Sequence, residues 1–114
     1  MKSGIVVGCL LLAFVTAAGA ADCVKGPDGK VVCGAGQCAT NQYGKVFCAK
    51  EGGGAVRDRF GGVKCGVGMC AEDDFGTVKC SSQPGGGALR EASGKVKCLG
   101  DCQDGSEQRC ETPR

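Results

Sequence analysis

Eleven cysteines are the residues of this 114-residue chain whose type and number could do chemistry. Cysteine thiolates bind zinc, exchange electrons or pair as disulfides, and their spacing and cellular compartment distinguish these uses. Ten of the eleven follow residue 20, and an even number is what complete pairing requires. We take these ten as disulfide candidates: Cys23, Cys33, Cys38, Cys48, Cys65, Cys70, Cys80, Cys98, Cys102 and Cys110.

Metal and redox uses of the cysteines fit the spacing less well. A thiol redox site is typically a C-x-x-C pair, and no two cysteines in the sequence have that spacing. Two C-x4-C pairs, Cys33 with Cys38 and Cys65 with Cys70, would offer four thiolates to a tetrahedral zinc ion. Thiolates in an oxidising compartment become disulfides, however. We therefore predict no metal and no cofactor, and keep a Cys-based metal or redox protein as an alternative.

Other catalytic groups are scarce. The sequence has no histidine, which removes the commonest general base and excludes Ser-His and Cys-His nucleophile pairs. Asp73 and Asp74 are adjacent, and neighbouring side chains on a strand or turn point apart, so the two carboxylates do not form an acid–base pair. The chain is predicted not to be an enzyme.

The segment 70–80, C-A-E-D-D-F-G-T-V-K-C, predicts a β-hairpin closed by its own disulfide. Asp73 and Gly76 occupy the first and fourth positions of a turn, where a type I turn prefers these residue types. Gly76 can also adopt a left-handed conformation without steric cost. In this register Cys70 faces Cys80 as a non-hydrogen-bonded pair, with α-carbons roughly 4.5 Å apart. A disulfide spans that separation without moving the backbone.

Variants of this unit recur from residue 23 to residue 98. Segments 23–33 and 38–48 have the same cysteine spacing, and the pattern G-x-V-x-C ends five times at a cysteine. Two copies lack the first cysteine; we take them to begin at Gly54 and Gly87 and to be one residue longer. The larger period of 32 to 33 residues is typical of proteins in which neighbouring repeats stack.

These patterns predict an all-β fold, a meander or short solenoid of disulfide-stapled β-hairpin repeats, after an N-terminal helical signal peptide. Residues 1–20 form the signal peptide, because a lysine precedes an apolar run that ends in small residues. The run is too short to span a bilayer, so no stable membrane span is expected after cleavage. Residues 21–98 form the hairpin region, and residues 99–114 form a polar, Cys-closed cap and a disordered tail.

Two schemes compete for the disulfide connectivity. The hairpin register favours the first, which pairs residues 23 with 33, 38 with 48, 70 with 80, 102 with 110, and 65 with 98. The last of these pairs would join the two hairpins that lack an opening cysteine. The rival scheme closes the linkers instead, with 33 to 38, 65 to 70, and 98 to 102.

Composition limits both folding and partners. Large apolar residues are few, so the apolar core alone is not expected to hold the chain folded. The net charge of +2 gives no field that would attract nucleic acid or an anionic membrane. We expect four lysines on the outer sheet face to be solvated rather than to form a binding stripe: Lys64, Lys79, Lys95 and Lys97.

The leading functional hypothesis is a non-enzymatic structural or binding protein of the cell envelope, periplasmic or secreted, whose partner is an unknown protein or envelope component. Disulfides place it in an oxidising compartment. The alternative is a secreted effector, toxin or hydrolase inhibitor, which would make contact through the loop 101–109 or through the glycine runs at 52–54 and 85–87.

Overall fold

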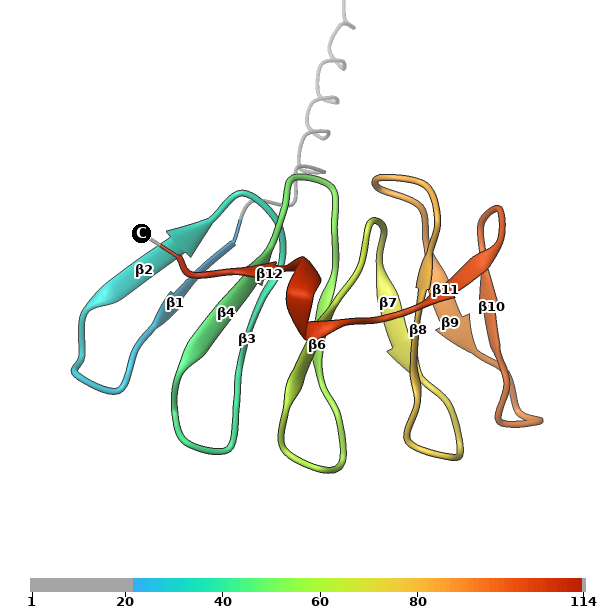
Figure 1. The fold of residues 1–114 in the computed structure, drawn as a ribbon, viewed down its shortest axis with the longest axis horizontal. Helices are drawn as coiled ribbons and strands as arrows, with labels where there is room; N and C mark the ends of the chain where they lie inside the picture. Colours follow the sequence, from blue (N-terminus) through green and yellow to red (C-terminus); the bar gives the residue numbers. More distant parts are fainter. Residues whose placement is uncertain (1–21, 114) are drawn as a thin grey trace, which may run out of the picture.

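The computed structural model describes residues 22–113, which form five antiparallel β-hairpins and a C-terminal segment that crosses them (Figure 1). The predicted signal peptide, residues 1–20, lies outside the described residues. The hairpins stand side by side in chain order, with their turns along one edge of the molecule (Figure 1). Their strands are β1 (Asp22–Lys25), β2 (Val31–Gly34), β3 (Cys38–Thr40), β4 (Val46–Ala49), β5 (Ala55–Arg57), β6 (Val63–Cys65), β7 (Cys70–Glu72), β8 (Val78–Ser81), β9 (Ala88–Arg90) and β10 (Val96–Cys98).

The predicted all-β fold class is confirmed. The C-terminal segment adds β11 (Cys102–Asp104), a single 3-10 turn η3 (Glu107–Arg109) and β12 (Cys110–Glu111). This turn is the only helical element in residues 22–113, where the sequence predicted no helix. No helix within these residues is long and apolar enough to cross a membrane.

The predicted hairpin register is confirmed in the fourth hairpin. Cys70 lies opposite Cys80, and Glu72 lies opposite Val78. Gly76 has a φ of 85°, the left-handed conformation that the turn requires. Two other hairpins have the same arrangement, with Cys23 bonded to Cys33 and Cys38 bonded to Cys48. The α-carbons of the three bonded pairs lie 4.0, 4.0 and 3.9 Å apart.

The two hairpins without an opening cysteine begin one residue later than predicted. Ala55 lies opposite Cys65, and Ala88 lies opposite Cys98, so alanine occupies the position of the first cysteine. All five hairpins therefore have the same length, and the extra residue belongs to the linker. Gly54 is such a linker residue, because its amide donates a hydrogen bond to the carbonyl of Gly68 rather than to its own hairpin.

Linker hydrogen bonds repeat along the stack and join neighbouring hairpins. The amide of Gln37 donates to the carbonyl of Gly53 at 3.0 Å, and 32 residues later the amide of Met69 donates to the carbonyl of Gly86 at 2.8 Å. Glycine is required where a linker passes over a disulfide. A Cβ atom at Gly66 would lie 2.3 Å from the Cβ of Cys80, so no larger residue fits there without a shift of the backbone.

The interior is built from sulfur and small side chains. The largest fully buried side chains among residues 22–113 are those of Cys48, Cys65, Cys80 and Ser81. Valine and alanine complete the buried set, with Ala49, Ala55 and Val63 packed around Cys65. Phenylalanine, leucine and tyrosine lie mostly at the surface: Tyr43, Phe60, Phe75, Leu89 and Leu99.

A strap, which we define as residues 102–111, runs back across the hairpins from the fourth to the second (Figure 1). Strand β11 pairs with β8, and β12 pairs with β4. Between them the amide of Ser106 donates to the carbonyl of Cys65 at 2.9 Å, and the amide of Cys65 donates back at 3.0 Å. The sequence predicted a local cap and a disordered tail from 111, whereas Glu111 belongs to a strand that pairs far along the chain.

The strap also corrects two predicted disulfides. Cys65 bonds to Cys110, and Cys98 bonds to Cys102, in place of the predicted pairs 65–98 and 102–110. The fourth hairpin stands between the third and the fifth and so separates Cys65 from Cys98 (Figure 1). From the rival scheme, the 98–102 pair is present, whereas the other linker cysteines are bonded within hairpins or to the strap.

Candidate interaction surface at the hairpin turns

Three aromatic side chains stand exposed at the turns of three consecutive hairpins. Tyr43 is 82%, Phe60 70% and Phe75 85% exposed, and each is the sixth residue of its hairpin. We call these three residues the tip row. Burying an aromatic ring is strongly favourable, so three that remain in water along one edge are a candidate interaction surface.

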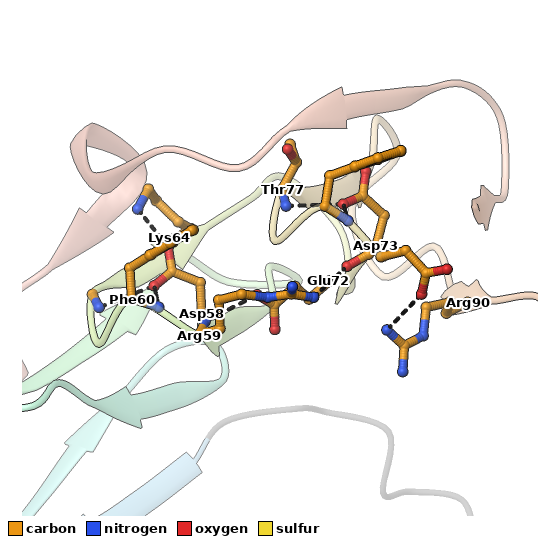
Figure 2. Close-up of polar contacts among 11 residues, drawn as sticks. Asp58, Arg59, Phe60, Lys64, Glu72, Asp73, Thr77 and Arg90 are labelled. Atoms are coloured by element: carbon orange, nitrogen blue, oxygen red, sulfur yellow. Dashed lines mark hydrogen bonds and ion pairs between the residues drawn. The ribbon is translucent and has the colours of Figure 1, made fainter. Parts of the chain in front are cut away.

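A side-chain oxygen fixes the turn beneath each ring. It belongs to the fourth hairpin residue and accepts hydrogen bonds from the backbone amides two and four positions later, which is the Asx-turn pattern. The distances are 2.9 to 3.1 Å in all three hairpins. The acceptors are Asn41, Asp58 and Asp73, and Figure 2 shows the last of these with Thr77. The three rings therefore leave equivalent backbone positions.

Neighbouring turns touch through a glycine. Gly76, which follows Phe75 in the turn, would place a Cβ atom 3.0 Å from Cε2 of Phe60. The ring of Phe60 therefore lies against the backbone of the next turn, and a side chain at Gly76 would displace it. A backbone hydrogen bond joins the second turn to the third, since the amide of Gln42 donates to the carbonyl of Gly61 at 2.8 Å.

Charged groups join the third turn to the fourth (Figure 2). The backbone amide and Nε of Arg59 both donate to Oε2 of Glu72, at 2.9 and 3.3 Å. Its Nη2 donates to the carbonyl of Asp73 at 3.2 Å. Further along the row, Arg90 lies 3.4 Å from Oδ1 of Asp74. Each turn is thus attached to the next, and the tip row is held by a continuous set of contacts.

Asp58 is the buried carboxylate of this surface, with its side chain only 5% exposed. Its Oδ2 accepts a hydrogen bond from Nζ of Lys64 at 2.9 Å. Burial raises the pKa of Asp58, but the hydrogen bond from Lys64 and those from the Gly62 and Phe60 amides outweigh burial and hold the pKa below its ordinary value of 3.8. The carboxylate is therefore charged and fixed beneath Phe60.

Replacing Asp58 by asparagine tests this ion pair. Asn keeps an oxygen for the turn amides but leaves Lys64 with only the more distant carboxylate of Glu107, at 3.9 Å, so we expect D58N to lower the free energy of unfolding by about 1–3 kcal/mol at pH 7. A lowered folded-state pKa contributes stability above the unfolded pKa and loses it as pH falls through the folded value. The difference from the wild type should therefore shrink below about pH 4.

Denaturant unfolding at pH 7 and pH 3 measures both effects. Asp73→Asn is the matched control, because Asp73 occupies the same turn position and its carboxylate accepts from the amides of its own turn in the described part of the chain. Equal losses in the two variants at pH 7, or a D58N deficit as large at pH 3 as at pH 7, would contradict the assigned role of the ion pair.

The lysines expected to be solvated are partly engaged by acidic residues. Lys79 forms an ion pair with Asp104 of the strap, and this hydrogen bond raises the pKa of Lys79 above 10.5. Lys64 lies 3.9 Å from Glu107, also in the strap. Lys97 lies 3.8 Å from Glu91. Strap carboxylates therefore match hairpin lysines, which helps to explain where the polar C-terminal segment lies.

A groove adjoins one end of the tip row. It has a volume of about 350 Å³ and lies between the first two hairpins and residues 112 and 113, which follow the strap. Apolar side chains dominate its wall, and Tyr43 at its rim connects it to the tip row. The apolar lining includes Pro27, Val32, Tyr43, Val46 and Pro113.

The predicted site residues are placed as follows. All ten candidate cysteines are in disulfides, and the four thiols proposed for zinc belong to four different ones. The predicted contact loop 101–109 lies mainly in the strap, with Asp104 facing Lys79. Of the predicted glycine runs, Gly53 and Gly54 are buried in a linker. Most residues of 101–109, together with Gly85 and Gly87, are exposed, and the tip row is a further exposed surface.

Sequence reasoning missed the tip row, although a signal was present. Tyr43, Phe60 and Phe75 occupy the same position in three aligned repeats. An aromatic residue at a turn position that packing leaves open is a stronger indication of binding than one within a strand.

Comparison with protein-family models, with curated proteins and with solved structures finds no match to this chain. The chain is a small disulfide-rich β-hairpin repeat protein. Its five disulfides indicate an oxidising, extracytoplasmic environment, because cytosolic thiols are kept reduced.

Proposed function

We propose that this protein is an exported, non-enzymatic binding protein of the cell envelope, periplasmic or secreted, which holds an envelope component at the tip row. The observation that carries the proposal is the exposure of Tyr43, Phe60 and Phe75 on equivalent, rigid turns. Exposed aromatic rings are a common feature of binding surfaces. The predicted signal peptide and the disulfides support export.

The stack of hairpins suits binding rather than catalysis. Disulfides within the second and fourth hairpins and the 65–110 bond in the third fix the strands that carry the three rings. A rigid surface binds without the entropic cost of ordering its own side chains and loops. The sequence lacks histidine, and the acidic groups near the tip row are engaged in turns and ion pairs.

Retention of the exported protein on its native envelope tests the proposal. The triple variant Y43S/F60S/F75S is expected to lose at least tenfold in the fraction retained on washed envelope. The matched control V31S/L89S/L99S removes three exposed apolar side chains outside the tip row and should bind as the wild type does. Equal retention of the two triple variants would contradict the proposal, provided that both keep the wild-type circular dichroism spectrum.

A further inference from the structure

We propose that the ligand of the tip row is a linear, uncharged polysaccharide whose sugar rings stack on Tyr43, Phe60 and Phe75. This inference rests on the binding function proposed above and names its ligand class. The C–H face of a sugar ring is apolar and packs on an aromatic face, while its hydroxyl groups require hydrogen-bonding neighbours.

Polar residues separate the rings. In each of the three turns, the residue before the ring is Gln42, Arg59 or Asp74, and the residue after it is glycine. The Gln42 side chain lies against Gly61 of the third turn and that of Arg59 against Gly76 of the fourth, so an amide and a guanidinium group lie between the turns that carry the rings. The apolar centre of a typical protein interface is more continuous than this. A chain of sugars, which alternates apolar ring faces with hydroxyl groups, matches the pattern better.

The charge of the turns favours an uncharged ligand. The five turn segments, 26–30, 41–45, 58–62, 73–77 and 91–95, contain four basic and five acidic residues. Several of these are already engaged, as Asp58 is with Lys64 and Asp74 is with Arg90. No cluster of one sign remains at this edge to attract phosphate groups or anionic lipid headgroups.

Repetition of the scaffold favours a repeating ligand. The three rings leave equivalent turns of consecutive hairpins, so the same contact is offered three times along a line. A polymer that occupies one ring meets the next at high effective concentration, which raises its affinity without any new type of contact. The groove beside Tyr43, with Pro27 and Pro113 in its wall, provides a concave position for one further sugar unit.

Titration calorimetry of the oxidised, exported protein with cello-oligosaccharides and chito-oligosaccharides of two to eight units tests the proposal. Affinity in at least one series should rise with chain length and level off once the ligand spans the three rings. Replacing Phe60, the central ring, by alanine should weaken binding of the longest oligosaccharide roughly tenfold. It should also flatten the dependence on length, because the two remaining rings are no longer adjacent. Leu89→Ala, an exposed apolar control on β9, should leave affinity unchanged.

The outcomes separate this inference from the proposed function. Absence of binding in both series, with tip-dependent retention on native envelope, would overturn the polysaccharide while leaving the binding function in place. Binding to phosphatidylcholine vesicles that depends on Phe60 and Phe75, without oligosaccharide binding, would assign the tip row to a lipid surface and equally overturn the inference. If the wild-type protein binds neither oligosaccharide series and its retention on native envelope does not depend on the tip row, both proposals are overturned.

Discussion

Complete reduction of the five disulfides is expected to unfold residues 22–113. Cystine sulfur occupies the positions at which most domains bury leucine or phenylalanine, since Cys48, Cys65 and Cys80 are among the largest fully buried side chains. In the loop-entropy account, a bond that closes an eleven-residue hairpin contributes about 2.8 kcal/mol, and the 65–110 bond contributes about 4 kcal/mol. Their combined loss is comparable with the whole free energy of unfolding of a small domain, about 5–15 kcal/mol.

Far-ultraviolet circular dichroism and amide hydrogen exchange, with and without a phosphine reductant in the same buffer, measure this effect. The oxidised protein should keep its strand signal and protect the linker amides, for example that of Gly68, which donates to Ser81. The reduced protein should lose both. A reduced sample that retains the strand signal would show that valine, alanine and backbone hydrogen bonds are sufficient for folding.

The second large effect is expected from removing the bond between the strap and the third hairpin. The double variant C65A/C110A should lower the free energy of unfolding by about 4 kcal/mol, because this bond closes the longest loop of the five. Alanine avoids placing a hydroxyl group in the site of Cys65, which is fully buried. The strap would then be held by backbone pairing, by the 98–102 bond and by the contacts of Lys79 with Asp104 and of Lys64 with Glu107.

Denaturant unfolding and hydrogen exchange at residues 65 and 106, whose amides bond to each other's carbonyls, measure the loss. C98A/C102A is the matched control, because its bond closes a loop of five residues and is worth about 2 kcal/mol in the same account. Exchange at residue 106 should accelerate strongly in C65A/C110A and little in the control. If both variants lose the same stability and the same protection, the strap is not fastened by the 65–110 bond.

The hairpins could be predicted because the forces that specify them are local. Turn residues and the spacing of Cys70 and Cys80 fix a register within eleven residues, and the structure has that register. Alternation of strand faces then places the sulfurs together. The first strand residue was harder to predict in the two copies without a first cysteine. Nothing in the sequence favours Ala55 or Ala88 over the glycine before it.

The strap could not be predicted because its partners are distant and its own pattern is weak. Residues 102–111 have no alternation of apolar and polar side chains, and β12 pairs with a strand about 60 residues earlier. Because Cys102 and Cys110 were predicted to close one loop, Cys65 and Cys98 were left to pair with each other, and both predicted disulfides were wrong. The acidic residues of the strap could have indicated its position. Asp104 contacts Lys79 and Glu107 contacts Lys64, and each lysine directly precedes a hairpin cysteine in the sequence V-K-C.

The candidate site was missed for a different reason. Packing determines which residues of a repeat are buried, and a repeat pattern alone does not state which turn positions stay in water. Phe60 and Phe75 could have been assigned to the interior, as aromatic rings usually are. In the structure, cystine, valine, alanine and serine fill most of the space between the hairpins, and Phe60 and Phe75 lie at the surface.

The strap also limits how the number of hairpin repeats in this protein can change. Arrays in which each repeat contacts only its neighbours gain or lose units by tandem duplication, because the ends are free. In this protein, the ten residues of the strap reach from the fourth hairpin to the second, so their number is matched to that distance. A chain with one more 32-residue unit would shift Cys110 away from Cys65 unless the strap grew by the same span. Repeat number and C-terminal length are therefore expected to change together.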